Sequence, residues 1–480
     1  MKNLKKNVSL LIFCGLLSTI NAQTKSEKID DLLTFYNENG MFNGMALVAE
    51  KGEIVFTKAY GYANFEDKIP FDSTSVFAIA SITKPYTATG IMMLKERGLL
   101  SYEDKLNKYF PDLPNAASSI TIRNLLTHTS GIADIRGRRY KVWFMPLITD
   151  EIIYDTLKSD FQLLFEPGSK YEYSNSNYFY LAKIIEQISE MSYREFIEEK
   201  IFKPVGMRNS YVDDGFWDSI PNRINGYSYY WNNTDYDLRD KGNGYGNIYS
   251  SIYDQFLFDQ ALYTNALVKQ ETLKEAYDES LYLDTERGYK YGLGWRILHK
   301  DDSSIVVSHN GAIGGFNNLL WRDVTNKNSL IILTNSWWLK ETPEIIWGTQ
   351  AVMVGKDPTR AKISIQVLFL DNWYLHGIDA ALNKMRNVIA ESPDKYDYSE
   401  DLLNNLAFYF IYSRNEPNNA KNVLECSLEI YPKSANLWDS LGEINSMLDD
   451  KKAAIICYEK SLEFDPDNEN AKEMLDKLKD

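Results

Sequence analysis

The C-terminal part of this chain repeats itself at a fixed spacing, and this repetition constrains the fold more than any other feature. The stretch Ser427-Leu428-Glu429-Ile430-Tyr431-Pro432 recurs 34 residues later as Ser461-Leu462-Glu463-Phe464-Asp465-Pro466. A unit of this length holds one pair of helices and cannot bury its own apolar face, so successive units must stack. We therefore expect residues 373–480 to form an α-helical repeat domain, distinct from the chain before it.

The last full unit resembles a tetratricopeptide repeat, through Trp438, Leu441, Gly442, Ala454, Tyr458, Ser461 and Pro466. The unit before it lacks the Trp and Gly, and a degenerate helix pair is expected between Trp373 and Ser392. Residues 356–372 are expected to be a linker. Two interpretations of the repeats remain open: a groove that binds a protein partner, and a short structural appendage docked on the first domain.

The N-terminus has the pattern of an export signal. A basic start is followed by an apolar run over residues 8–17 and by small and polar residues that end near Ala22. The run is too short to span a bilayer, which takes about 20 residues. We expect residues 1–22 to be removed, leaving a periplasmic or secreted protein with no membrane span; a retained anchor is the alternative.

Charge argues against two classes of partner. The formal net charge is −15, from 67 acidic and 52 basic residues, which repels nucleic acid and anionic membrane surfaces. The sequence contains no C-x-x-C and no H-E-x-x-H, so it predicts no metal site and no cofactor.

Residues 23–355 mix helical and strand patterns and are expected to form the first domain. Helices are predicted at 25–38, 81–98 and 177–189, and a hairpin at 45–59 that turns at Lys51-Gly52. Further strands are predicted at 304–308, 318–321 and 329–334. Residues 208–250, rich in Tyr, Asn, Gly and Asp, are expected to be loop.

A serine and a lysine at helical spacing offer a nucleophile and a base. In Ser81-Ile82-Thr83-Lys84, a spacing of three places both side chains on one face of a helix that follows an apolar segment. A lysine whose pKa is lowered can take the serine proton, and the helix N-terminus favours an oxyanion. The same pattern at Ser392 to Lys395 lies in a polar stretch without partner motifs.

Two later motifs carry candidate partners. Tyr173-Ser174-Asn175 follows a Pro-Gly turn and precedes a helix, so it is expected on a loop; a tyrosine near lysines can also act as a base. His309-Asn310-Gly311 directly follows a predicted strand and precedes Gly314-Gly315, where a substrate can lie along a strand edge. Each motif alone is equally well explained by ordinary packing.

Together and in this order, the three motifs resemble those of the serine β-lactamase-like family: class C β-lactamases, D-Ala-D-Ala carboxypeptidases and related esterases. The stretches 125–131, 167–168, 201–207 and 291–295 are also similar to family segments. The resemblance implies an α/β (α+β) fold, with an antiparallel sheet flanked by helices and an all-helical subdomain, before the helical repeat domain.

The resemblance also implies roles for the site residues. Ser81 would be acylated, and Lys84 and Tyr173 would shuttle its proton. Asn175 would orient the substrate amide or Lys84. His309, Asn310 and Gly311 would border the substrate, and the N–H groups of Ser81 and Ala312 would form the oxyanion hole. His128 matches a position that we take as structural.

Two departures from the family pattern bear on the substrate. His309 stands where β-lactamases usually carry Lys, and a mostly neutral histidine is a poorer partner for a β-lactam carboxylate. The segment 244–251 replaces a plainer Gly-Gly and Ser-Thr segment. We expect an exported serine hydrolase acting on a peptide, amide or ester, with a D-amino-acid peptidase or esterase favoured over an efficient β-lactamase. The alternative is a non-catalytic penicillin-binding-like receptor.

Overall fold

A computed structural model describes residues 23–137, 149–215, 219–227, 242–278, 282–298, 304–336 and 342–479. The predicted signal segment 1–22 lies outside the described residues. Among the described residues, no helix combines the length and the apolar character needed to cross a bilayer.

The first domain is built on a seven-stranded antiparallel sheet in the order β2-β1-β12-β11-β10-β9-β8. The strands are β1 (Gly44–Glu50), β2 (Glu53–Tyr60), β8 (Lys290–Tyr291), β9 (Arg296–Leu298), β10 (Val306–Ile313), β11 (Phe316–Asp323) and β12 (Asn328–Thr334). Lys51 and Gly52 both have positive φ, at 54° and 82°, as the tight turn of the predicted hairpin requires.

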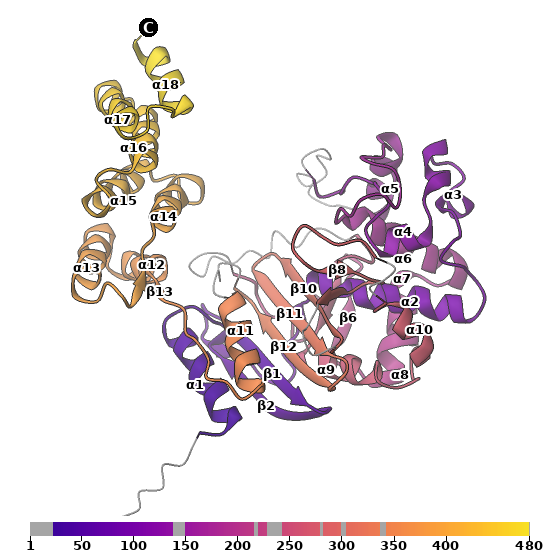
Figure 1. Ribbon diagram of the computed structural model, residues 1–480. Helices are drawn as coiled ribbons and strands as arrows, with labels where there is room; N and C mark the ends of the chain where they lie inside the picture. Colours follow the sequence, from indigo (N-terminus) through magenta and orange to yellow (C-terminus); the bar gives the residue numbers. More distant parts are fainter. Residues whose placement is uncertain are drawn as a thin grey trace, which may run out of the picture.

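Strand β12 is buried on both of its faces, which explains why it is an almost continuous apolar run. Leu330 and Ile332 pack into one core, and Ile331 and Leu333 into the other, because side chains alternate along a strand. On one face lie α1 (Lys25–Glu38) and α11 (Thr342–Met353). On the other lie α2 (Thr83–Glu96) and α9 (Ile252–Ala261) (Figure 1).

Beyond α2 the chain forms a mostly helical subdomain, on the right of Figure 1. It comprises α3 (Leu106–Tyr109), α4 (Ile122–Leu126), α5 (Asp150–Ser159), α6 (Asn175–Ser189), α7 (Tyr193–Ile197) and α8 (Lys203–Val205), and α10 (Gln270–Glu275) lies beside it. Small sheets β3 (Tyr62–Asn64) with β4 (Ile69–Pro70), and β5 (Phe77–Ala78) with β7 (Ile248–Ser250) and β6 (Ser210–Val212), complete the domain. The prediction of loop over 208–250 is therefore wrong at its two ends, where β6 and β7 pair.

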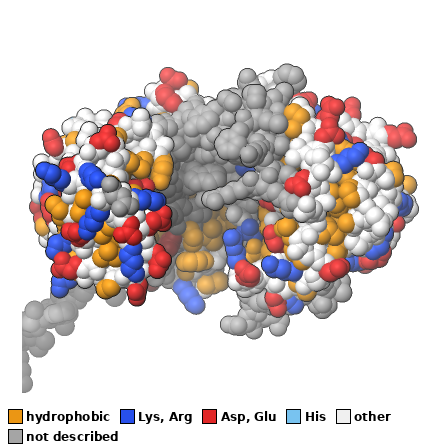
Figure 2. All heavy atoms as spheres, turned by 90° about the horizontal axis from the view of Figure 1, so that it is seen from above, with side chains coloured by type: hydrophobic (Ala, Val, Ile, Leu, Met, Phe, Trp, Pro, Cys, Tyr) orange, Lys and Arg blue, Asp and Glu red, His pale blue; other side chains and the backbone are white. Residues whose placement is uncertain are grey.

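The C-terminal region is a stack of paired helices, as the repeat predicted. The helices are α12 (Ile365–His376), α13 (Ile378–Glu391), α14 (Glu400–Tyr412), α15 (Pro417–Ile430), α16 (Ala435–Met447), α17 (Lys451–Phe464) and α18 (Glu469–Lys479). Across the face shown in Figure 2, acidic and basic side chains intermingle over the described residues. The assignment to tetratricopeptide repeats stays a prediction.

The segment 356–372, predicted to be a linker, is only partly irregular. Strand β13 (Ile363–Ser364) pairs in parallel with β14 (Tyr396–Asp397), and α12 begins at Ile365. The side chains of Ile365, Phe369 and Leu370 join the same core as α1 and α11. The apolar residues of this segment therefore join the two regions. The fold class inferred from the sequence is confirmed.

Candidate active site

Ser81 lies in a short 3-10 turn, Ala80–Ile82, which leads directly into α2. Ala80, just before it, has φ of +49°, a left-handed conformation that costs a non-glycine residue about 1–3 kcal/mol. The neighbouring Ile79 N–H donates to the carbonyl of Ile248 on β7 at 3.0 Å, which helps to hold this turn. Ser81 lines a cavity of about 440 Å³, so its hydroxyl opens onto a space that fits a small substrate.

Lys84 lies one turn further along and is fully buried. Its Nζ is 3.0 Å from Ser81 Oγ, and it donates to Asn175 Oδ1 and to the Tyr245 carbonyl, both at 2.8 Å. Because a hydroxyl can both donate and accept, the same geometry serves an ammonium and a neutral amine. In the neutral state two N–H groups bind the oxygens and the lone pair faces the serine proton.

Tyr173 completes the cluster. The Lys84 Nζ lies 4.9 Å from the centre of its ring. Burial raises the pKa of Tyr173 above its ordinary value, and a hydrogen bond with Ser81 partly offsets this rise. Tyr173 is therefore a neutral phenol at pH 7, able to donate a proton beside the nucleophile.

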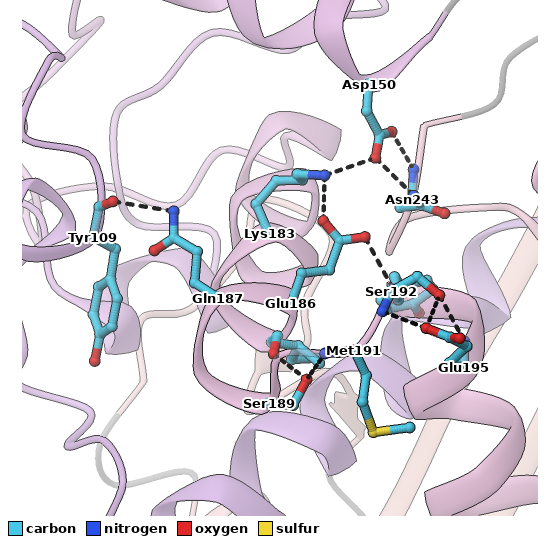
Figure 3. A network of polar contacts seen from close by, with 12 residues as sticks. Tyr109, Asp150, Lys183, Glu186, Gln187, Ser189, Met191, Ser192, Glu195 and Asn243 are labelled. Atoms are coloured by element: carbon cyan, nitrogen blue, oxygen red, sulfur yellow. Dashed lines mark hydrogen bonds and ion pairs between the residues drawn. The ribbon is translucent and has the colours of Figure 1, made fainter.

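The segment 242–247 lies next to Lys84, and the carbonyl of its Tyr245 accepts a hydrogen bond from Lys84 Nζ. The N–H and Nδ2 of Asn243 bind Asp150 at 3.2 and 2.7 Å, and Asp150 also pairs with Lys183 of α6 at 3.1 Å (Figure 3). Gly244, with φ of +90°, passes so close to α6 that a Cβ would lie 2.4 Å from the Tyr178 carbonyl. This network fastens the segment to the helical subdomain, and sequence reasoning did not foresee its role.

His128 supports the loop that carries Tyr173. Its Nδ1 accepts from the backbone N–H of Ser174 at 3.1 Å, so we infer that the proton of the neutral ring is on Nε2. The His128 and Tyr173 rings lie 4.3 Å apart, centre to centre. Burial and the neighbouring Lys84 charge hold the pKa of His128 well below its usual value. His128 therefore packs against the ring of Tyr173 and holds the backbone of Ser174 in place.

Strand β10 borders the other side of the cavity. β9 pairs with β10 only as far as Ser308, so the stretch from His309 to Ile313 lies beyond the end of that pairing. Asn310 and Ala312 line the cavity with Ser81. At Gly311 a Cβ would lie 2.0 Å from the Ile79 carbonyl and 3.1 Å from the Ser81 nitrogen, so only glycine lets the strand approach this closely.

The side chain of His309 does not border the cavity, contrary to the expectation that it flanks the substrate. It is fully buried, and its Nδ1 lies 2.7 Å from the Asn310 carbonyl and its Nε2 2.8 Å from the Tyr291 hydroxyl. Nδ1 must carry the proton, since a carbonyl only accepts. Burial, with Arg296 and Lys84 nearby, holds the pKa of His309 well below its usual value.

Arg296, at the start of β9, is a cavity residue that the sequence analysis missed. Its guanidinium carbon lies 5.2 Å from the centre of the Tyr289 ring, and among the described residues its Nε has no hydrogen-bond partner. Lys170 and Arg287 line the same cavity, as do Glu172 and Glu286. Three cationic side chains, Arg296, Lys170 and Arg287, therefore line the cavity, whereas His309 contributes no charge to it.

Known proteins share this architecture. The sequence model of the Beta-lactamase family matches residues 29–344. Penicillin-binding protein 4* of Bacillus subtilis is 33% identical over 331 residues, which are 65% of this chain and 72% of that protein.

Two solved structures are similar at 25% identity. The octameric penicillin-binding protein homologue from Pyrococcus abyssi has a TM-score of 0.63, over 69% of this chain and 78% of that one. The D-amino acid amidase from Ochrobactrum anthropi, complexed with D-phenylalanine, has a TM-score of 0.59, over 69% and 99%. The chain belongs to the Beta-lactamase family.

Proposed function

We propose that this protein is an exported serine hydrolase that forms an acyl-enzyme at Ser81. The observation that carries the proposal is the cluster in which Lys84 Nζ lies 3.0 Å from Ser81 Oγ, beside Tyr173, at the wall of an open cavity. A nucleophile within hydrogen-bond reach of a base, which a third group orients, is the arrangement that acyl transfer needs. Export rests on the sequence of residues 1–22.

The reaction runs in two halves. Ser81 Oγ attacks the substrate carbonyl carbon and gives its proton to the neutral amine of Lys84. The oxyanion forms between the N–H groups of Ser81 and Ala312. The leaving group departs with the proton of Tyr173, and the Lys84 ammonium returns a proton to the phenolate. Water then attacks the ester, gives its proton to Lys84, and Ser81 leaves with that proton as the acid is released.

The favoured substrate is a peptide or amide of a D-amino acid with a carboxylate near the scissile bond, and an ester is the second choice. His309 is neutral and enclosed, so it offers a substrate carboxylate no charge. Arg296 lines the cavity and can hold a carboxylate in a bidentate manner. The D-amino acid amidase among the similar structures has a related fold and supports the choice of a D-amino-acid amide, though not the carboxylate.

The test compares wild type with Ser81→Ala on p-nitrophenyl butyrate, a fluorescent penicillin and a D-Ala-D-Ala peptide. We expect Ser81-dependent hydrolysis, with the peptide turned over faster than its C-terminal amide. Arg296→Gln should remove that preference for the free carboxylate. If the wild type acylates no faster than Ser81→Ala on any of the three, the enzyme proposal fails and the receptor alternative stands.

A further inference from the structure

Asp134 binds Asn175, the residue that contacts Lys84, and takes no part in the reaction steps proposed for the hydrolase. Asp134 Oδ2 accepts from the Nδ2 of Asn175 at 3.1 Å, and Asp134 Oδ1 from the Asn175 backbone N–H at 3.3 Å. Oδ1 also accepts from the backbone N–H of Arg136 at 3.0 Å. Asp134 is not among the residues that line the cavity, so its contacts point to an indirect role.

These contacts decide which way the carboxamide of Asn175 faces. The side chain of Asn175 has one accepting and one donating end, and either can point toward Lys84. Lys84 presents an N–H group to Asn175 in either charge state, and an ionised carboxylate only accepts, so Lys84 binds the amide oxygen and Asp134 binds the amide nitrogen. With Asp134 in place, Asn175 Oδ1 is held 2.8 Å from Lys84 Nζ.

We propose that Asp134 is a positioning residue that acts on Lys84 through Asn175, and this proposal rests on the proposed function. The chain of contacts runs from Asp134 to Asn175, then to Lys84 Nζ, then to Ser81 Oγ. Without the carboxylate, the Nδ2 and the backbone N–H of Asn175 lose the partner that fixes the side chain, and Lys84 alone still holds its Oδ1. The contact that directs Lys84 Nζ at the serine is then no longer fixed in position.

A double-mutant cycle in kcat with p-nitrophenyl butyrate tests this indirect action. We expect Asp134→Ala to lower kcat by about 10- to 100-fold, the scale of a misplaced reacting group, with KM changed by less than about threefold. In an Asn175→Ala background, Asp134→Ala should lower kcat by less than about twofold, since the group it acts through is gone. Losses that multiply in the double variant would overturn the proposal.

Ser176→Ala provides a matched control. The buried Ser176 hydroxyl donates to the Ala133 carbonyl at 2.7 Å and accepts from the Ile135 N–H at 2.9 Å, so it joins the same two segments without touching Lys84. We expect this variant to lower Tm and to leave kcat within about threefold of wild type. A Ser176→Ala loss in kcat equal to that of Asp134→Ala would mean that Asp134 only stabilises the fold.

A second readout does not depend on turnover. In crystal structures, Asp134→Ala should move Lys84 Nζ out of hydrogen-bond range of Ser81 Oγ, while Ser176→Ala should leave the 3.0 Å contact intact. An unchanged contact in Asp134→Ala would refute the positioning role even if wild type hydrolysed none of the test substrates. Wild type without Ser81-dependent hydrolysis, but with a displaced Lys84 in the variant, would refute the proposed function alone.

Discussion

Removal of the Tyr173 hydroxyl should separate chemistry from stability. In Tyr173→Phe the ring keeps its neighbours, since its closest ring contact, at 4.3 Å, is with His128 and involves no oxygen. What is lost is the phenol proton beside Ser81. General acid–base catalysis contributes about 10²–10⁴-fold. We therefore expect kcat to fall by that factor, or by about 2.7–5.4 kcal/mol in activation free energy.

The substitution should change the stability of the fold very little. One hydrogen bond of about 1 kcal/mol disappears together with a buried polar atom that needed it. The assay is steady-state and burst kinetics with p-nitrophenyl butyrate, alongside Tm. The control is Tyr193→Phe, another buried tyrosine, whose hydroxyl lies 2.7 Å from Thr87 Oγ1; it should keep kcat within about threefold. A Tyr173→Phe enzyme with kcat within about threefold of wild type would refute the assignment.

Three further predictions follow from the geometry. Asp259→Ala should lower the free energy of unfolding in urea by about 3–5 kcal/mol, because it leaves the fully buried Arg322 cation without its ion-pair partner. Asp112→Ala, at an exposed pair with Lys158, should lower it by at most about 1 kcal/mol, and equal losses would contradict the prediction. Gly311→Ala should lower kcat by about 100-fold or more, because its Cβ meets the Ile79 carbonyl. Gly246→Ala should stay active, because its Cβ would lie 3.9 Å from the nearest neighbouring atom, in Ala80; full activity in Gly311→Ala would count against the close approach. His128 and His309 stay neutral in the folded protein but bind protons when it unfolds, so the free energy of unfolding should fall as pH drops below about 6.5. In the double variant His128→Gln and His309→Gln, the dependence of this free energy on pH between about 6.5 and 5.5 should be weaker, and an unchanged dependence would refute the prediction.

Local patterns account for most of what the sequence could predict. The helix at 25–38 and the hairpin at Lys51-Gly52 follow from short-range periodicity and turn chemistry, and both are found. The spacing of Ser81 and Lys84 needs only one turn of helix to become a contact. Features of this kind depend on neighbours in the sequence, so a single chain reveals them.

The error at His309 has a simple cause. The strand was predicted to end at Ser308, so His309, directly after it, was expected to border the substrate. β10 in fact continues to Ile313, and its alternation turns His309 and Gly311 away from the cavity and Asn310 and Ala312 toward it. A predicted strand that continued five residues further, to Ile313, would have placed the His309 side chain away from the cavity, as observed.

The missed residues depend on contacts between distant parts of the chain. Lys84 binds the carbonyl of Tyr245, which is 161 residues away, and Asp134 reaches the site only through Asn175. Arg296 is one arginine near the edge of a strand and carries no local signal. Nothing in the order of residues reveals such meetings before the fold brings them together.

The single core that joins α1, α11 and the C-terminal helices has a mechanical consequence. Helix α12 packs beside the turn that follows α1, where a Cβ added at Gly40 would lie 2.6 Å from Cγ1 of Val367. The stack is therefore held at its α12 end, while its far end at α18 stands clear of the first domain in Figure 1. A molecule bound to the far helices would therefore act on the first domain through the contact between α12 and the turn after α1.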